Sequence, residues 1–516
     1  MKTQFDLGRA EINVSPESRP KLEGPESDTP FKILLLGDFG GTGPRQRPAQ
    51  RKMRPLRLDR DNFEEVLSSL DIRLSLPLAG EASKPLTLRI RELEDFHPDR
   101  LFGTLPVFQE LKSLRLQLLD LSSFPAAAAR IQSWGNQPAA GKPAALPEAI
   151  LPPMSSSQLL DQMLGGGEEV SASSAPPAPP KDEWQDFLGK IVAPHLKPGT
   201  DPRQPQMLAL VDAALSGLMR QILHHPAFQA AEALWRGLFL LISRLETEEN
   251  LQIYIADLPR EVLFDDLLSI PRDELDQSMM FECLVENALE TPGADPWALV
   301  AGCYQFGDEL KDILWLARMS NLAAASTTPF LGAASPRLLG LDSFSHTSEP
   351  RRWEAARDLA AAWQQLRGLE GASFLGLALP RLLLRLPYGR KSDPLERFEF
   401  EEMDTTPRHE DYLWGNPALG CVYLMAEAFS QAGWDFRPGE LQEIGGLPFH
   451  VYEEEGESRS KPCAETLLTM EMAEKILEAG IMPFLSFKGR DFIRLARFQS
   501  IAFPSAPLEG RWGSGE

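Results

Sequence analysis

The sequence contains no long hydrophobic run and few cysteines. No window holds the roughly 18 consecutive apolar residues of a membrane-spanning helix, and residues 1–21 contain no apolar stretch of signal-peptide length. Four cysteines in 516 residues, none in CxxC spacing, exclude a disulfide scaffold and a zinc site built from neighbouring thiolates. We therefore expect a cytoplasmic chain without membrane insertion, whose cysteines are buried as small apolar residues.

Positive charge is also scarce. The chain has 52 Lys and Arg against 74 Asp and Glu, a formal net charge of −22, which disfavours nucleic acid as a partner. Residues 31–60 are the exception, with six more basic than acidic side chains. This basic strip is interpreted either as a solvated loop or as a docking strip for an acidic neighbour, such as another copy of the chain. Its candidate contact residues are Arg51, Lys52, Arg54 and Arg57.

Recognisable catalytic and cofactor motifs are missing as well. The loop GDFGGTG (37–43) follows an expected strand, where a phosphate-binding loop would lie, but Gly43 is followed by Pro44 and Arg45 instead of the Lys-Ser/Thr of a P-loop. The loop therefore departs from a phosphate-binding motif, and a nucleotide-binding enzyme using it is kept as an alternative. We assign no catalytic, metal-binding or cofactor-binding residue and expect a protein that is not an enzyme.

Two clusters of polar residues favour structural roles. His224 and His225 are adjacent, so on a helix their side chains diverge by about 100° and cannot grip one metal ion; with Pro226 next, they indicate a helix end. Glu399, Glu401 and Glu402 surround Phe400 in an alternating pattern that predicts a strand with one acidic face. A solvated or salt-bridged edge is favoured there over an acid/base pair.

The hydrophobic pattern predicts a mixed α/β fold. A small α/β domain is expected to be joined by a disordered Pro/Ala-rich linker to a larger domain of sheet covered by helices. The predicted divisions are a flexible arm (1–29), the small domain (30–121), the linker (122–205), the larger domain (206–505) and a flexible tail (506–516). The arm, at 13–20 above all, could donate a strand to a neighbouring subunit.

Individual elements follow from the same pattern. Strands are predicted at 31–39, 86–93, 251–258, 297–304, 328–334, 373–379, 449–452 and 482–487. Helices are predicted at 59–70, 97–120, 207–245 with a break at His225-Pro226, 308–325, 351–367, 416–431 and 466–478.

One short helix is predicted inside the linker. In SSSQLLDQMLGG (155–166), serines precede an apolar stripe at helical spacing and glycines follow it. The stripe consists of Leu159, Leu160, Met163 and Leu164. A short amphipathic helix of this kind is either a recognition peptide for a partner or a helix packed on its own protein.

Both halves of the chain resemble known proteins. PFKILLLGDFGG (30–41), DRDNFEEVLSSL (59–70) and LEDFHPDRLFGTLPVFQELKSLRLQL (93–118) resemble the small subunit of the type VI secretion contractile sheath, TssB or VipA. The second half is similar to the large sheath subunit, TssC or VipB. Its matching pieces are ILHHPAFQAAEALWRGLFLLI (222–242), TPFLGAASPRLLGLDSF (328–344), LGLALPRLLLRLPYG (375–389), FEFEE (398–402), YLWGNPA (412–418) and GLPFHVY (446–452).

The resemblance implies a structural component of the contractile sheath that powers ejection by conformational change. The expected partners are other sheath subunits, including a complete large subunit, the inner tube protein, baseplate proteins and a ClpV-type AAA+ ATPase, which would grip helix 155–166. The two subunits are normally separate, and the large one is expected to continue past GRDFIRLARFQSIAF (489–503) into a further domain. An accessory protein that caps, anchors or regulates the sheath therefore remains an alternative.

The resemblance also includes several distinctive large and polar residues of the second half. We interpret them as core and buried polar network rather than as catalytic groups. They are Trp235, Arg236, Arg381, Arg385, Tyr388, Trp414 and Asn416.

Overall fold

The computed structural model divides the chain into two compact units. One combines Met1–Gly103 with Met219–Glu516, and the other is Thr104–Leu218. The described residues are 25–41, 53–77, 85–120, 122–135, 204–345, 349–403 and 407–512. No described helix is long and apolar enough to cross a membrane.

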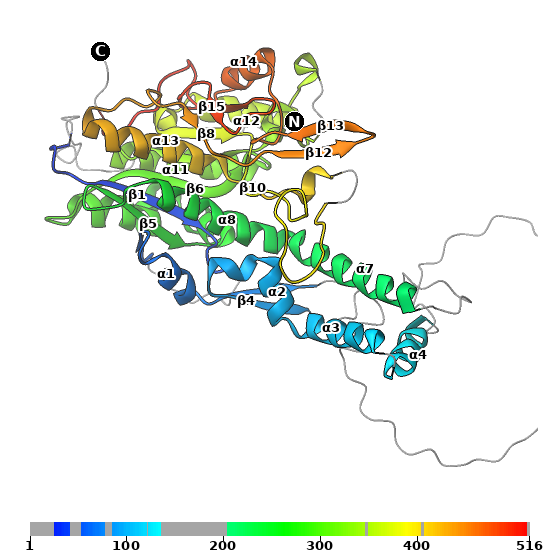
Figure 1. The fold of residues 1–516 in the computed structure, drawn as a ribbon. Coiled ribbons are helices and arrows are strands. Elements are labelled where there is room, and N and C mark those ends of the chain that lie inside the picture. The colour runs from blue at the N-terminus through cyan, green and yellow to red at the C-terminus, as the bar shows by residue number, and fades with distance from the viewer. Residues whose placement is uncertain are drawn as a thin grey trace, which may run out of the picture. The chain divides into compact units, whose positions relative to one another are not determined.

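A nine-stranded sheet organises the first unit (Figure 1). Its order is β11-β15-β14-β8-β7-β6-β1-β5-β2. The strands from β14 to β5 run parallel to their neighbours, whereas β2, β15 and β11 are antiparallel additions at the two edges. The bounds are β1 Phe31–Gly37, β2 Leu56–Leu58, β5 Leu251–Asp257, β6 Trp297–Phe306, β7 Phe330–Ala334, β8 Leu375–Leu379, β11 Glu443–Ile444, β14 Met482–Ser486 and β15 Ile493–Leu495.

Strand β1 is central to this sheet although it lies near the start of the chain. It pairs in parallel with β5 on one side, from Phe31 opposite Leu251 to Gly37 opposite Asp257, and with β6 on the other. Five of its apolar side chains are completely buried, which explains the continuous apolar run FKILLL. The N-terminal and C-terminal parts of the chain therefore share one sheet and one core.

Helices cover both faces of the sheet. Leu34 and Leu36 point into a core shared with the helices α9 to α12, whereas Phe31 points the other way and its ring lies 4.7 Å from that of Phe429 in α13. The bounds are α1 Phe63–Ser69, α2 Pro98–Thr104, α8 Pro226–Arg244, α9 Arg260–Leu268, α10 Met279–Phe281, α11 Leu310–Ser326, α12 Arg357–Arg367, α13 Pro417–Ala432 and α14 Met470–Glu478.

Three small antiparallel pairs complete the first unit. They are β3 (Ile72–Leu76) with β4 (Leu86–Ile90), β9 (Leu382–Leu383) with β10 (Trp414–Gly415), and β12 (His450–Glu454) with β13 (Glu457–Lys461). The β12–β13 hairpin turns through Glu455 and Gly456, both with positive φ.

The second unit is helical. It contains α3 (Pro106–Leu119), α4 (Phe124–Gly135) and α7 (Gln204–Leu223) as far as Leu218. An ion pair joins α3 to α7, with Arg115 Nε 2.7 Å from Asp212 Oδ1. The side-chain amide of Gln204 donates to the carbonyl of Leu118 at the end of α3, which satisfies one of the carbonyls that a helix end leaves free.

The mixed α/β class and the helix break at His225-Pro226 are confirmed. Several boundaries differ from the sequence-based ones. The nine-stranded sheet contains strands from both 30–121 and 206–505, which were expected to be separate domains. Helix α4 lies within the expected linker. The expected tail is packed as far as Trp512, which is 5% exposed. The strand expected over 398–402 is wrong, because these residues are irregular. The remainder of the linker, with helix 155–166, lies outside the described residues.

Candidate functional site: a buried charge network

The start of α8 places one carboxylate inside the protein. Pro226 occupies the first turn, where no backbone N–H is needed, and the ring of His225 caps the helix by accepting a hydrogen bond from the Ala227 amide. The buried stripe of α8 includes Phe228, Trp235 and also Glu232, which is 0% exposed. A carboxylate buried in this way requires cationic or hydrogen-bonding partners.

Arg385, from the segment LPRLLLRLPYG, is the main partner. Its Nε lies 2.8 Å from Glu232 Oε1, and its Nη1 and Nη2 lie 2.7 and 3.0 Å from the two carboxylate oxygens of Glu402. The guanidinium thus bridges two buried carboxylates, and its contact with Glu402 is bidentate, the strongest geometry for this pair. Burial opposes the charge of Arg385, but the two glutamates raise its pKa well above the usual value.

A second arginine completes the charge balance. Arg236, one turn after Glu232 on α8, donates from Nε to Glu232 Oε1 at 2.7 Å and from Nη2 to the hydroxyl of Tyr388 at 3.1 Å. The Tyr388 ring also lies under the Arg385 guanidinium, 4.4 Å from its centroid. Two arginines and two glutamates form a neutral cluster, which we call the buried charge network.

Glu402 is the most constrained member. Besides Arg385, it accepts the backbone N–H of Tyr388 at 2.8 Å, and its own N–H donates to the Tyr388 carbonyl. Burial pushes its pKa upward, but Arg385 and these hydrogen bonds outweigh it and lower the pKa to about 2. Of the three neighbouring acids, Glu399 remains 84% exposed in a surface pair with Arg390. The expected salt bridge is therefore present at Glu402, but in the core rather than at an edge.

A pocket of about 320 Å³ adjoins this network where α7 ends. His224 lies in its wall, with Nε2 3.4 Å from Glu402 Oε1 and Nδ1 3.2 Å from Asp411 Oδ1. Asp411 in turn pairs with Arg408 at 2.7 Å. The acidic wall residues Glu402 and Asp411 are thus paired with Arg385 and Arg408, and Arg220 in the same wall donates from Nε to the backbone carbonyl of Glu401.

A second buried cluster surrounds Glu465. This carboxylate accepts from the backbone and side chain of Arg381 and lies 3.1 Å from His409 Nε2. Burial raises its pKa, but His409 and Arg381 lower it to about 2. Lys461 approaches the other ring nitrogen of His409 at 3.0 Å. The cluster ties the segment after β8 to the strand β13.

The remaining residues of the sequence motifs are also structural. Trp235 is fully buried and its indole N–H donates to the carbonyl of Phe39. Asn416 caps α13 through the Ala418 amide and donates to the Tyr304 carbonyl. Glu232, in contrast, was missed by the sequence interpretation. An acidic residue within the apolar stripe of EALWRGLFLLI was the signal that could have identified it.

The glycine loop does not have the character of a phosphate site in its described part, Gly37–Gly41. The Gly40 amide, which a phosphate would need, donates to the Asp257 carboxylate at 2.9 Å. The Phe39 side chain is completely buried against Trp235. A carboxylate at this position repels phosphate oxygens.

The basic strip is only partly described. Arg54 and Arg57 are exposed beside and on the edge strand β2, and Arg57 Nη2 donates to the carbonyl of Glu248 at 3.0 Å. Arg51 and Lys52 lie outside the described residues, as do Leu159, Leu160, Met163 and Leu164 of the predicted recognition helix.

The cysteines and potential metal ligands complete the survey. All four cysteines are free; Cys283, Cys421 and Cys463 are buried, and burial raises the pKa of Cys283 and of the partly buried Cys303 to about 12. The described part of the chain holds no group of three or more His, Cys, Asp or Glu suited to a metal ion.

Comparison with known proteins agrees with this architecture. Residues 205–502 match the family model described as EvpB/VC_A0108, tail sheath N-terminal domain. The chain belongs to this tail sheath family. Residues 9–133 match a second model, described as Type VI secretion system, VipA, VC_A0107 or Hcp2. This sheath-family chain therefore unites a VipA-type and a VipB-type region, as the sequence motifs indicated.

A relative extends the comparison. The sheath-family chain is 32% identical over 305 residues to the type VI secretion system sheath protein TssC1 of Pseudomonas aeruginosa. The match covers 58% of this chain and 61% of TssC1. The buried charge network lies entirely inside the VipB-type region, whereas β1 and β2 come from the VipA-type region.

Proposed function

We propose that this protein is a single-chain structural subunit of a type VI secretion contractile sheath, in which the small-subunit and large-subunit regions fold as one protomer. The position of β1 is the observation that supports it most strongly. A VipA-type strand lies between β5 and β6 of the VipB-type region, so neither region completes the sheet without the other.

Contacts outside the sheet favour the same conclusion. The Asp99 carboxylate of the VipA-type region accepts the backbone amides of Glu396 and Arg397 at 3.0 and 3.1 Å. The Phe102 ring stacks on Phe398 at 4.4 Å. These contacts hold the irregular segment between Tyr388 and Glu402. Tyr388 is bonded to Arg236 of α8, and Glu402 is linked to Glu232 of α8 through Arg385.

The remaining roles follow from this proposal. A sheath releases energy when rigid subunits rotate and repack, which requires domains that resist deformation and surfaces that exchange contacts. The partners would be further sheath subunits, the inner tube protein and baseplate proteins. Helix 155–166 would be the segment gripped by a ClpV-type ATPase. Neither a catalytic group nor a cofactor is needed for such work, and the chain would act in the cytoplasm.

Co-sedimentation tests the proposal. The purified chain is mixed with a complete large sheath subunit under conditions in which sheath tubes form, and the tubes are pelleted. We expect the chain in the pellet with the tubes, and we expect Leu35→Asp, which places a charge inside β1, to abolish its incorporation. A wild-type chain that stays in the supernatant would contradict a sheath role.

A further inference from the structure

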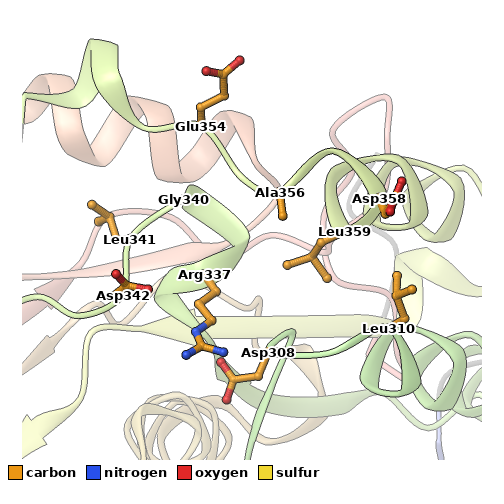
Figure 2. Close-up of a pocket in the computed structure, with 10 residues that line it drawn as sticks. All are labelled: Asp308, Leu310, Arg337, Gly340, Leu341, Asp342, Glu354, Ala356, Asp358 and Leu359. Carbon is orange, nitrogen blue, oxygen red and sulfur yellow. The ribbon is translucent and has the colours of Figure 1, made fainter.

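A second pocket lies at the carboxyl ends of β6 and β7. Its volume is about 410 Å³. Figure 2 shows its lining, in which Arg337 points toward Asp308 and Leu359 points toward the middle of the group. The ten lining residues are Asp308, Leu310, Arg337, Gly340, Leu341, Asp342, Glu354, Ala356, Asp358 and Leu359. We call it the acidic pocket.

The backbone around the acidic pocket is closely fitted. Gly340 has φ +79°, and a Cβ atom there would lie 2.3 Å from the backbone of Glu354. Only glycine lets the turn after β7 lie against the segment that leads into α12. Leu341 and Leu359, 7% and 8% exposed, form an apolar floor between these two segments. The pocket is therefore shaped by packing and not by an open loop.

Its charge is strongly one-sided. Four acidic residues and a single basic one, Arg337, line it; Asp342, Glu354 and Asp358 are exposed at its rim. Asp308 is engaged, because it accepts a hydrogen bond from Ser335. The side-chain carboxylates of Asp342, Glu354 and Asp358 form no hydrogen bond or ion pair with the residues that the structure describes. An apolar floor below free carboxylates suits a cation with an aliphatic stem, such as an arginine side chain.

The chain itself carries such cations at one edge of its sheet. Arg54 and Arg57 are exposed at β2, which is four strand spacings from β7 in the order β7-β6-β1-β5-β2. At about 4.8 Å per spacing this is roughly 19 Å, longer than a side chain can reach. Arg57 moreover points toward Glu248, which precedes β5 and thus lies at the amino ends of the parallel strands. The arginines of one copy therefore cannot enter its own acidic pocket.

We propose that the acidic pocket of one copy receives the Arg54 and Arg57 edge of a second copy. This inference rests on the proposed sheath function, in which copies stand side by side. Charge complementarity identifies a second copy as the partner. Two copies of a chain with net charge −22 repel each other, except where a basic surface of one meets an acidic surface of the other. The pairing is heterologous, so it propagates along a lattice instead of closing into a dimer.

The acidic tip of the β12–β13 hairpin is the alternative binding surface for Arg54 and Arg57 of a second copy. Two of its glutamates are already neutralised, Glu453 by Lys391 at 3.3 Å and Glu454 by Arg459 at 2.8 Å. The hairpin is moreover a two-stranded ribbon without an apolar floor. It is better suited as a control, because Glu455→Lys with Glu457→Lys changes the net charge by the same amount as a double change in the pocket.

A charge swap in the full-length chain tests the pairing. Self-association is measured by sedimentation velocity for Asp342→Lys with Glu354→Lys, for Arg54→Glu with Arg57→Glu, and for the four changes combined. We expect each pair alone to weaken association about tenfold, since two partly screened ion pairs become repulsive, and the combination to restore it. Added salt should weaken the wild type most.

Three results would overturn the pairing. The first is a wild-type chain that remains monomeric. The second is a pocket variant that self-associates as strongly as the hairpin control. The third is a variant with all four changes that self-associates no more strongly than either double variant. Pelleting with a complete large subunit separates this inference from the sheath proposal. If the pocket variant enters tubes as well as the wild type, the sheath role stands and only the pocket assignment fails.

Discussion

Replacing Arg385 by Met tests whether the buried charge network stabilises the first unit. The side chain is 8% exposed and makes three strong hydrogen bonds to Glu232 and Glu402. Without it, Glu232 keeps Arg236, but Glu402 remains buried and loses the one guanidinium that contacts it among the described residues. Removing one partner of a buried ion pair typically costs 3–5 kcal/mol, and because one of the two carboxylates stays paired we expect a loss of about 3–4 kcal/mol.

The dependence of this loss on pH carries a definite sign. In the wild type the pKa of Glu402 is lowered from 4.5 to about 2, so its contribution to stability is complete above pH 4.5 and lost as the pH falls toward 2. In the variant, burial without Arg385 raises the pKa of Glu402 above 4.5. The folded variant then binds a proton more readily than the unfolded chain, and its stability increases as the pH falls from 7 toward 4.5. The deficit relative to the wild type should therefore shrink over this range.

Urea unfolding followed by tryptophan fluorescence measures both effects, and urea avoids the screening that a guanidinium salt would add. Arg390→Met is the matched control, because the Arg390 side chain is 66% exposed and forms an ion pair with the exposed Glu399. We expect little change in that variant. Equal unfolding midpoints for the two variants, or a deficit that grows on acidification, would refute the reasoning.

Two further predictions rest on the structure, and a third rests on the sequence of residues 155–166. Leu35→Ala should lower the free energy of unfolding by about 2–5 kcal/mol in the same urea assay. Leu56 is 39% exposed at the sheet edge, so Leu56→Ala should have little effect. Equal losses in the two variants would contradict a central position of β1. Gly340→Ala should lower the free energy of unfolding by about 1–3 kcal/mol, because of the positive φ and the close backbone of Glu354. Gly445→Ala should be tolerated, since no atom lies near the Cβ position of Gly445. An unchanged stability of Gly340→Ala would refute the close fit. Leu160→Asp with Met163→Asp should abolish binding to the N-terminal domain of a ClpV-type ATPase in a pull-down, and Gln162→Asp should not; unchanged binding would assign helix 155–166 to packing.

The elements of the fold could be predicted from the sequence to a large extent. The run FKILLL indicated a strand covered on both faces, and β1 is such a strand. His225-Pro226 indicated a helix break, and α8 begins there. What the pattern could not reveal was which strands pair with β1, because pairing partners more than 200 residues away leave no local signal. The separate small domain expected at 30–121 was inferred from the proximity of its elements in the chain.

The buried charge network shows the same limit for side chains. FEFEE alternates as a strand does, yet Glu402 lies inside the protein because Arg385 and the Tyr388 amide meet it there. Local alternation cannot distinguish a solvated glutamate from a buried one when the compensating arginine lies 17 residues away. The packing of Trp512 has the same origin, since its ring contacts Phe436, far from it in the chain.

Electron microscopy of mixed assemblies tests the central claim, a single-chain sheath protomer, most directly. The chain, labelled at one terminus, is assembled with a complete large sheath subunit and imaged by negative stain and cryo-microscopy. The account predicts helical tubes in which the label repeats along the wall and in which density for one copy contains β1 between β5 and β6. Tubes that never carry the label, or a VipA-type strand contributed to that position by a different chain, would contradict it.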